Sequence, residues 1–362
     1  MSITDQQVQA ALKELTDPNT GKDYVTSRSA KNIKIDGADV SVDIELGYPA
    51  KTQIDAIRRE VIAKLKTLPG VGNVSANVYS KIVSHAVQRG VKLIPGVKNI
   101  IAVASGKGGV GKSTTAVNLA LALAAEGATV GILDADIYGP SQPQMLGITG
   151  RPESRDGKSL EPLEAYGVQA MSIGFLIDPE QPMVWRGPMV TQALQQLLND
   201  TRWRDVDYLV IDLPPGTGDI QLTLAQQVPV TGAVIVTTPQ DIALLDARKG
   251  LKMFEKVGIP ILGIVENMSI HICSKCGHEE PIFGSGGGER MSRDYEVELL
   301  GQLPLDISIR EQADGGHPTV VADPDGRVAD IYRAIARRVA VRIAEKAKDM
   351  TSRFPNIVVQ NT

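Results

Sequence analysis

The stretch GKGGVGKST, which begins at Gly106, constrains the fold of this chain more than any other part of the sequence. It matches G-x-x-x-x-G-K-[ST] and stands between an apolar, β-branched run at 100–104 and a helical run at 113–125. Such a strand–turn–helix order predicts a phosphate-binding loop, because glycines let backbone N–H groups turn inward and the helix N-terminus adds positive partial charge. The predicted binding residues are Gly106, Lys107, Gly108, Gly109, Val110, Gly111, Lys112, Ser113 and Thr114.

The side chains of this loop predict its ligands. Lys112 is expected to reach the β- and γ-phosphates of a nucleotide, and the Ser113 hydroxyl is expected to ligate Mg²⁺. ATP and Mg²⁺ are therefore the expected cofactors. Lys107 adds a second positive charge to a small loop, which is electrostatically costly unless an anion is shared. Its position at the tip favours a contact with the nucleotide of a neighbouring subunit.

Hydrophobic patterning favours an α/β fold with two domains. Short runs that are apolar on both faces follow residue 99, among them IIAVAS, TVGILDAD, YLVIDL, AVIVTT and ILGIVE. They are typical of parallel strands covered by helices on both sides. Before residue 83, helical segments and alternating strands predict a small α+β domain. The predicted parts are a small α+β domain (1–82), a linker (83–98), a P-loop NTPase domain with a mostly parallel sheet (99–350) and a tail (351–362).

Three aspartates follow predicted strands. Asp134 and Asp136 end TVGILDAD, and Asp212 ends YLVID. Ligands bind at the carboxyl ends of parallel strands in such folds, although carboxylates there are often only caps. Asp212 resembles a Walker B carboxylate that holds Mg²⁺ through its water shell. Asp136 resembles the switch aspartate that orients the attacking water, and Asp134 is expected to be structural.

With Lys107, the loop resembles the signature-lysine, or deviant Walker A, class of P-loop ATPases. That class includes septum-site and plasmid-partition ATPases and the nitrogenase iron protein. The resemblance implies a homodimer that closes face to face on two ATP molecules, with Lys107 acting in trans. It also implies that Asn267, just after ILGIVE, contacts adenine, whereas an ordinary turn asparagine explains this position nearly as well.

The only two cysteines, Cys273 and Cys276, form a C-x-x-C pair, which leaves several interpretations open. A redox dithiol usually opens a helix in a thioredoxin-like unit, whereas this pair follows a strand in a polar segment. His271 and His278 flank the pair, so a single-chain Cys₂His₂ zinc site is conceivable. Two copies of the pair could also meet across a two-fold axis, where four thiolates suit an iron–sulfur cluster or zinc.

The order of motifs decides between these interpretations by resemblance. A small α+β domain is followed by KGGVGKSTT, DADIYGPSQP, DLPPGTGD, ENMS and CSKCG, and this order resembles the Mrp/ApbC family of ATP-binding iron–sulfur cluster carriers. The resemblance implies that Cys273 and Cys276 hold half of a [4Fe–4S] cluster that bridges a homodimer. It implies transfer of the cluster to apo-proteins, coupled to slow ATP hydrolysis, while the cluster donor stays unknown. The implied catalytic residues are Lys107, Lys112, Asp136 and Asp212.

Two other functions compete with a cluster carrier. A positioning ATPase of the septum or partition type usually has a membrane-binding tail or a basic DNA-binding face. Ile331, Ile335, Val339 and Ile343 form a stripe on the predicted helix at 328–346, which could lie on a membrane. Packing of this stripe on the core is the favoured interpretation. A P-loop synthetase or amidase would not need the cysteines.

Bulk composition excludes some partners. The net charge of −4 does not indicate a nucleic-acid binder, which usually carries an excess of positive charge. No run of about 18 apolar residues is present, so no membrane span is expected. Two cysteines do not make a disulfide scaffold, so we expect a cytoplasmic protein with reduced thiols.

Overall fold

The computed structural model of the protein describes residues 3–85, 93–177, 187–273 and 275–352. The chain divides into two compact units. The smaller unit holds the N-terminal residues up to Val83, Ala125–Gly127 and the residues from Ala340 onward, and the larger holds Ser84–Ala124 and Ala128–Val339. Parts of the predicted linker and tail lie outside the described residues, so the predicted domain boundaries stay predictions.

The smaller unit is an α+β fold with a three-stranded sheet. Its elements are α1 (Asp5–Lys13), β1 (Ala30–Asp36), β2 (Asp39–Leu46), α2 (Ile54–Leu65) and β3 (Val74–Ser80). β1 and β2 pair antiparallel, and β3 pairs with β2 in parallel. Alternate residues of β2 face the helices, because Val40, Val42, Ile44 and Leu46 are all buried. The period-two pattern of this strand is thereby confirmed.

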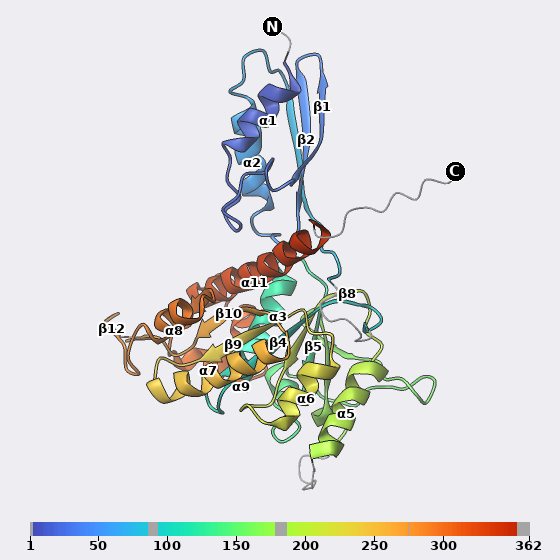
Figure 1. The fold of residues 1–362 in the computed structure, drawn as a ribbon, viewed down its shortest axis with the longest axis vertical. Helices are drawn as coiled ribbons and strands as arrows, with labels where there is room; N and C mark the ends of the chain where they lie inside the picture. Colours follow the sequence, from blue (N-terminus) through green and yellow to red (C-terminus); the bar gives the residue numbers. More distant parts are fainter. Residues whose placement is uncertain (1–2, 86–92, 178–186, 274, 353–362) are drawn as a thin grey trace. The chain divides into compact units, whose positions relative to one another are not determined.

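The larger unit is built on an eight-stranded sheet with the order β13-β10-β9-β4-β8-β5-β7-β6 (Figure 1). Its strands are β4 (Val97–Ser105), β5 (Val130–Asp134), β6 (Leu163–Ala165), β7 (Val168–Ser172), β8 (Val206–Asp212), β9 (Gly232–Thr237), β10 (Ile261–Glu266) and β13 (Leu299–Gln302). All pairs are parallel except β6 with β7. The predicted mostly parallel sheet is confirmed, and its parallel strands end at one edge.

Helices cover both faces of this sheet (Figure 1). They are α3 (Lys112–Ala125), α4 (Gln142–Met145), α5 (Gly187–Asp200), α6 (Asp219–Gln227), α7 (Asp241–Lys256), α8 (Gly287–Tyr295), α9 (Ile307–Asp314), α10 (Thr319–Ala322) and α11 (Arg327–Ser352), with a 3₁₀ turn at Ile173–Phe175. A small hairpin of β11 (His271–Ile272) and β12 (Glu279–Glu280) precedes α8. After its polar first turn, helix α3 is mostly apolar, and it is buried along most of its length, as expected for a central helix.

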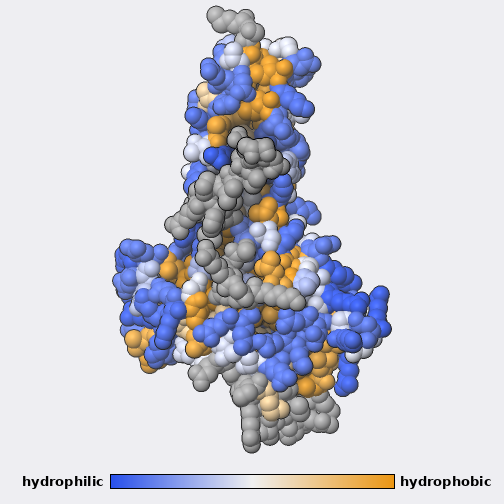
Figure 2. Space-filling model, turned by 45° about the vertical axis from the view of Figure 1, so that its right-hand side comes forward, coloured by the Kyte–Doolittle hydropathy of each residue, from blue (hydrophilic) through white to orange (hydrophobic). Residues whose placement is uncertain are grey.

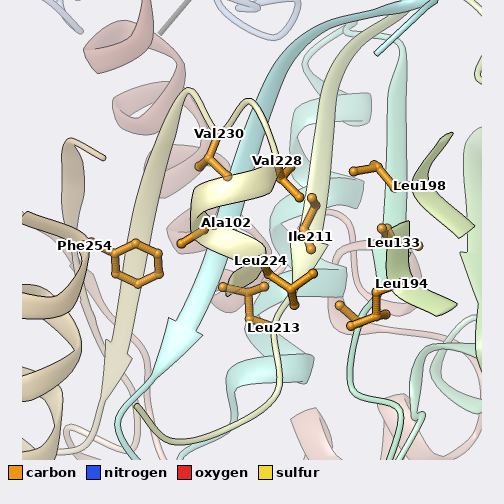
Figure 3. A pocket seen from close by; sticks show the side chains of 12 residues that line it. Ala102, Leu133, Leu194, Leu198, Ile211, Leu213, Leu224, Val228, Val230 and Phe254 are labelled. Atoms are coloured by element: carbon orange, nitrogen blue, oxygen red, sulfur yellow. The ribbon is translucent and has the colours of Figure 1, made fainter. Parts of the chain in front are cut away.

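An apolar cavity lies between the sheet and helices α5 and α6 (Figure 3). Leu194 of α5 and Leu224 of α6 line it together with Leu133, Ile211 and other side chains of the sheet. Its lining is entirely aliphatic or aromatic, and such cavities stay dry. These side chains pack α6 against the sheet directly after the loop that follows β8.

The part of helix α11 that belongs to the larger unit packs its part of the apolar stripe on the sheet of that unit. Ile335 and Val339 are buried, and a Cβ placed on Gly301 of β13 would lie 2.7 Å from the Ile335 side chain. The interpretation of this stripe as a membrane-binding face is therefore wrong, and packing on the core is confirmed. Among the described helices, none is both long and apolar enough to cross a membrane. Figure 2 shows hydrophilic residues over much of the described surface in that view, with smaller hydrophobic areas between them.

Candidate functional site

The phosphate-binding loop joins the carboxyl end of β4 to the first turn of α3. Gly109 and Gly111 have φ angles of +80° and +81°, a region that glycine adopts without a Cβ clash. At the start of the loop space is limited, because a Cβ on Gly106 would lie 2.2 Å from the carbonyl carbon of Asp246 in α7. The backbone path is therefore fixed by the neighbouring helix as well as by the glycines.

Lys112 and Asp212 form a buried ion pair at the centre of the site. The Lys112 side chain is 6% exposed and its ammonium contacts Oδ1 of Asp212, which is fully buried. The same ammonium donates to Oγ of Ser113 at 3.1 Å. β4 and β8 are neighbours in the sheet, so the loop after one strand meets the last residue of the other. An ammonium, a hydroxyl and a carboxylate thus lie together, as a P-loop requires for phosphate and Mg²⁺.

Gln142 belongs to this cluster, although no sequence signal singled it out. It is the first residue of α4 and is fully buried. Its Nε2 donates to Oδ2 of Asp212 at 2.9 Å and to the carbonyl oxygen of Ser113 at 3.1 Å. The residue stands in the stretch DADIYGPSQP, eight positions after Asp134. That stretch could have drawn attention to it, but the contact arises only in the folded chain.

Asp134 has a structural environment, in line with the expectation for it. Its carboxylate accepts hydrogen bonds of 3.0–3.1 Å from the backbone N–H groups of Asp136, Ser141 and Gln142 and from the hydroxyl of Ser172. Complete burial raises the pKa of Asp134, and the nearby charge of Asp212 raises it further, while the backbone N–H groups oppose this. The carboxylate therefore organises the turn that leads from β5 into α4.

Asp136 lies at the margin of the same cluster and is half-buried. Burial raises the pKa of its carboxyl group, and the positive charge of Lys112 opposes the rise. The side chain is thus close enough to Lys112 to be influenced by its charge. A role in orienting the attacking water stays a prediction.

Lys107 and Thr114 lie on either side of the glycine turn. The Lys107 side chain is half-exposed, and its carbonyl oxygen accepts the Ser105 hydroxyl at 2.9 Å. Thr114 is half-buried in the first turn of α3, where its carbonyl oxygen accepts Nδ2 of Asn118 at 2.9 Å. An action of Lys107 in trans concerns a second chain and stays a prediction.

Asn267 contacts the phosphate-binding loop itself. Its Nδ2 donates to the carbonyl oxygen of Val110 at 2.9 Å. A Cβ on Gly111 would lie only 2.1 Å from the same nitrogen, so the loop and this side chain fit each other closely. The contact with adenine stays a prediction, whereas the link from the end of β10 to the loop is a second role that sequence reasoning missed.

Glu266, the residue before Asn267, anchors the first turn of α8. It is fully buried, and its carboxylate accepts the backbone N–H of Gly288 and Nε2 of Gln302, the latter at 2.8 Å. The N-terminus of α8 favours a negative charge, which this carboxylate supplies. The end of β10 therefore ties the phosphate-binding loop on one side and the start of α8 on the other.

Cys273 and Cys276 lie in the turn of the β11–β12 hairpin. The turn is closed by the N–H of Cys273 on the carbonyl of His278 (2.9 Å) and the N–H of Gly277 on the carbonyl of Cys273 (2.8 Å). Cys276 is exposed and Cys273 is half-exposed. Backbone N–H groups of Lys275 and Cys276, and then the Cys276 thiol, lower the pKa of Cys273. The turn thus favours a thiolate, the form that binds metal, and it does not open a helix as a thioredoxin-like pair does.

The flanking histidines do not join the cysteines. Nδ1 of His271 lies 3.1 Å from the carbonyl oxygen of Leu305, so this nitrogen is a donor to the backbone. Within residues 3–85, 93–177, 187–273 and 275–352, no three His, Cys, Asp or Glu side chains are grouped to hold a metal ion. The structure therefore does not support the single-chain Cys₂His₂ zinc site.

Comparisons with known proteins agree with the two units. A family model described as NUBPL iron-transfer P-loop NTPase matches residues 96–340, and one described as iron-sulfur cluster assembly protein matches residues 5–78. The iron-sulfur cluster carrier protein of Pseudomonas fragi is 62% identical over 274 residues, which cover 75% of this chain and 96% of that protein. The carrier protein of Escherichia coli K12 is 51% identical over 337 residues, which cover 93% of this chain and 91% of that protein.

A solved structure resembles the larger unit. The nucleotide-binding protein from Archaeoglobus fulgidus, in complex with ADP, is 37% identical with a TM-score of 0.57, and the match covers 65% of this chain and 92% of that one. The match to the iron-transfer NTPase model covers well over half of the chain and confirms the resemblance to Mrp/ApbC proteins. This chain therefore belongs to the family of iron-transfer P-loop NTPases.

Proposed function

We propose that this protein is an ATP-hydrolysing carrier that holds a [4Fe–4S] cluster between two copies of the chain and passes it to apo-proteins. Membership of the iron-transfer P-loop NTPase family supports the ATPase and carrier activities. The observation that carries the finer proposal is the β11–β12 turn, where two accessible thiols lie on a hairpin whose backbone N–H groups favour a thiolate. A cytoplasmic location is part of the same proposal.

Ligand number supports sharing of the cluster. A [4Fe–4S] cluster is commonly held by four cysteine thiolates, and each chain contains only two cysteines. Two hairpins related by a two-fold axis supply the full set, since a symmetric dimer brings the same surface of each copy together. The cluster is the cargo of the protein, so exposed ligands suit its release better than a buried site does.

The nucleotide site supports ATP and Mg²⁺ as ligands. Oγ of Ser113 and the carboxylate of Asp212 are hard oxygen donors, which Mg²⁺ prefers. In our proposal Lys112 would bind the β- and γ-phosphates, and Ser113 and Asp212 would hold Mg²⁺, which would supply positive charge at the phosphates. Asp136 orients the attacking water, and Lys107 of the facing copy stabilises the charge on the transferred phosphoryl group.

A short path connects the nucleotide to the cysteines. Asn267 bonds the carbonyl of Val110, and Cys273 follows only six residues later. The intervening backbone is held by N–H donation from Ser269 to the carbonyl of Leu303 and from Leu305 to the carbonyl of Ile270. We propose that a conformational change of the phosphate-binding loop is transmitted along this segment to the hairpin. The change would alter the affinity of the hairpin for the cluster.

Serine substitution of either cysteine tests the cluster site. After anaerobic reconstitution with iron and sulfide, we expect Cys273→Ser and Cys276→Ser to lose the bound iron and sulfide and the broad absorbance of the cluster. His278→Ala, in the same hairpin, is the matched control and should retain all three, because the cluster takes thiolates only. Full iron retention in both serine variants, or loss of metal in His278→Ala, would contradict the proposal.

Mixing two inactive variants tests whether Lys107 acts in trans. We expect Lys107→Ala to lower ATP hydrolysis by about 10³-fold or more, as removal of an arginine finger does. Lys112→Ala should also be inactive, but it still presents Lys107 to a partner. Steady-state hydrolysis should therefore reappear when the two variants are mixed. A mixture as inactive as its components would show that Lys107 serves its own nucleotide.

Replacement of Asn267 tests the path from nucleotide to cluster. We expect reconstituted Asn267→Ala to keep its cluster but to transfer it to an apo-acceptor at the same rate with ATP and with ADP. The wild type and Asn199→Ala, an exposed asparagine of α5, should transfer at different rates with the two nucleotides. Equal rates in the wild type, or an undiminished difference in Asn267→Ala, would rule out this coupling.

A further inference from the structure

Only the nitrogen end of the Gln142 side-chain amide is hydrogen-bonded within the described residues. Both hydrogens of Nε2 are used, one on the Asp212 carboxylate and one on the Ser113 carbonyl. Two facing oxygens fix the orientation of the amide, since its own oxygen would be repelled there. The other end, Oε1, is buried and accepts no hydrogen bond from the described residues. A buried acceptor without a donor costs about 1–3 kcal/mol, so its position calls for an explanation.

The position of Gln142 is fixed by the hydrogen bonds of Asp134. The Asp134 carboxylate accepts the backbone N–H groups of Ser141 and Gln142, so it fixes the first residue of α4 beneath the phosphate-binding loop. From there the side chain spans the gap between the end of β8 and the start of α3. Asp134 therefore acts on the nucleotide site through Gln142, which explains why a buried carboxylate stands two residues before the predicted switch aspartate.

We propose that Gln142 is a positioning residue for Mg²⁺: it holds the Asp212 carboxylate and the Ser113 backbone in the geometry that the ion requires, and its Oε1 accepts a hydrogen bond from the hydration shell of the ion. This inference rests on the proposed Mg²⁺·ATP site. Mg²⁺ keeps several waters in protein sites, so a buried acceptor beside its two expected protein partners suits it. Lys112 also contacts both residues, through Oδ1 of Asp212 and Oγ of Ser113, whereas Gln142 takes Oδ2 of Asp212 and the backbone carbonyl of Ser113.

The Lys112–Asp212 pair shows why such a residue is needed. In our proposal the ammonium leaves Asp212 for the phosphates when nucleotide binds. Asp212 is fully buried, and an unpaired charge at such a depth is strongly unfavourable. The proposal requires the Gln142 amide to stay on Oδ2, where the contacts of α4 with Asp134 place it. It keeps the carboxylate oriented while Oδ1 exchanges its cation partner.

The test compares nucleotide binding with and without Mg²⁺. The probe is a fluorescent ADP analogue, titrated into the full-length protein in EDTA and across a series of Mg²⁺ concentrations. Gln142→Met keeps the length of the side chain and removes both hydrogen-bonding groups. The matched control is Gln144→Met, the same change on the exposed side of α4. Thermal unfolding without nucleotide checks that each variant is folded.

Mg²⁺ should increase the affinity of the protein for the ADP analogue. We expect Gln142→Met to raise the Mg²⁺ concentration that gives half of this increase by about 10-fold or more, as loss of an outer-sphere partner does. Its affinity for the analogue in EDTA should stay at the wild-type value, and Gln144→Met should match the wild type throughout. Gln142→Asn, whose amide is too short to span both partners, should shift in the same direction and serves alone if Gln142→Met does not fold.

Two outcomes would overturn the inference. A folded Gln142 variant with the wild-type Mg²⁺ dependence would show that the residue only fills space. An equal loss of affinity in EDTA and in Mg²⁺ would show that it shapes the loop and not the metal site. If the wild type itself binds the analogue equally with and without Mg²⁺, the proposed metal site fails, and this inference fails with it.

Discussion

The pairing of Lys112 with Asp212 is the contact on which the organisation of the larger unit depends. It exists because β4 and β8 are adjacent parallel strands, so the loop after one and the last residue of the other meet at the same edge of the sheet. Because the pair is buried, removal of one partner is expected to lower the free energy of unfolding by about 3–5 kcal/mol. Gln142 donates a hydrogen bond to the second oxygen of the same carboxylate.

The same edge of the sheet also carries the link to the cysteine hairpin. At the end of β10, Glu266 binds the start of α8 and Asn267 binds the phosphate-binding loop. Two neighbouring residues thus connect elements that are distant in sequence. In the hairpin that follows, Cys276 is exposed and Cys273 is half-exposed, whereas Lys112 and Asp212 are buried.

The sequence could predict those parts that local patterns encode. Buried β-branched runs predicted the parallel sheet, and the glycine motif predicted the loop between β4 and α3 that carries Lys112 and Ser113, because both patterns are local in sequence. Gln142 and Glu266 were missed because their roles depend on hydrogen-bond partners that are distant in sequence. Asp212 lies 70 positions from Gln142, and Gly288 lies 22 positions from Glu266. The stripe on α11 was ambiguous for a related reason, since Ile335 is covered by β13, which is distant in sequence.

The central claim is that two chains share one [4Fe–4S] cluster through Cys273 and Cys276. The most direct measurement is native mass spectrometry of the anaerobically reconstituted protein, which reports the number of chains and the mass of bound iron and sulfide in the same ion. Our account predicts a species of two chains with a single [4Fe–4S] cluster, and single chains free of metal. A cluster carried by a single chain, or one zinc ion in each chain, would contradict it.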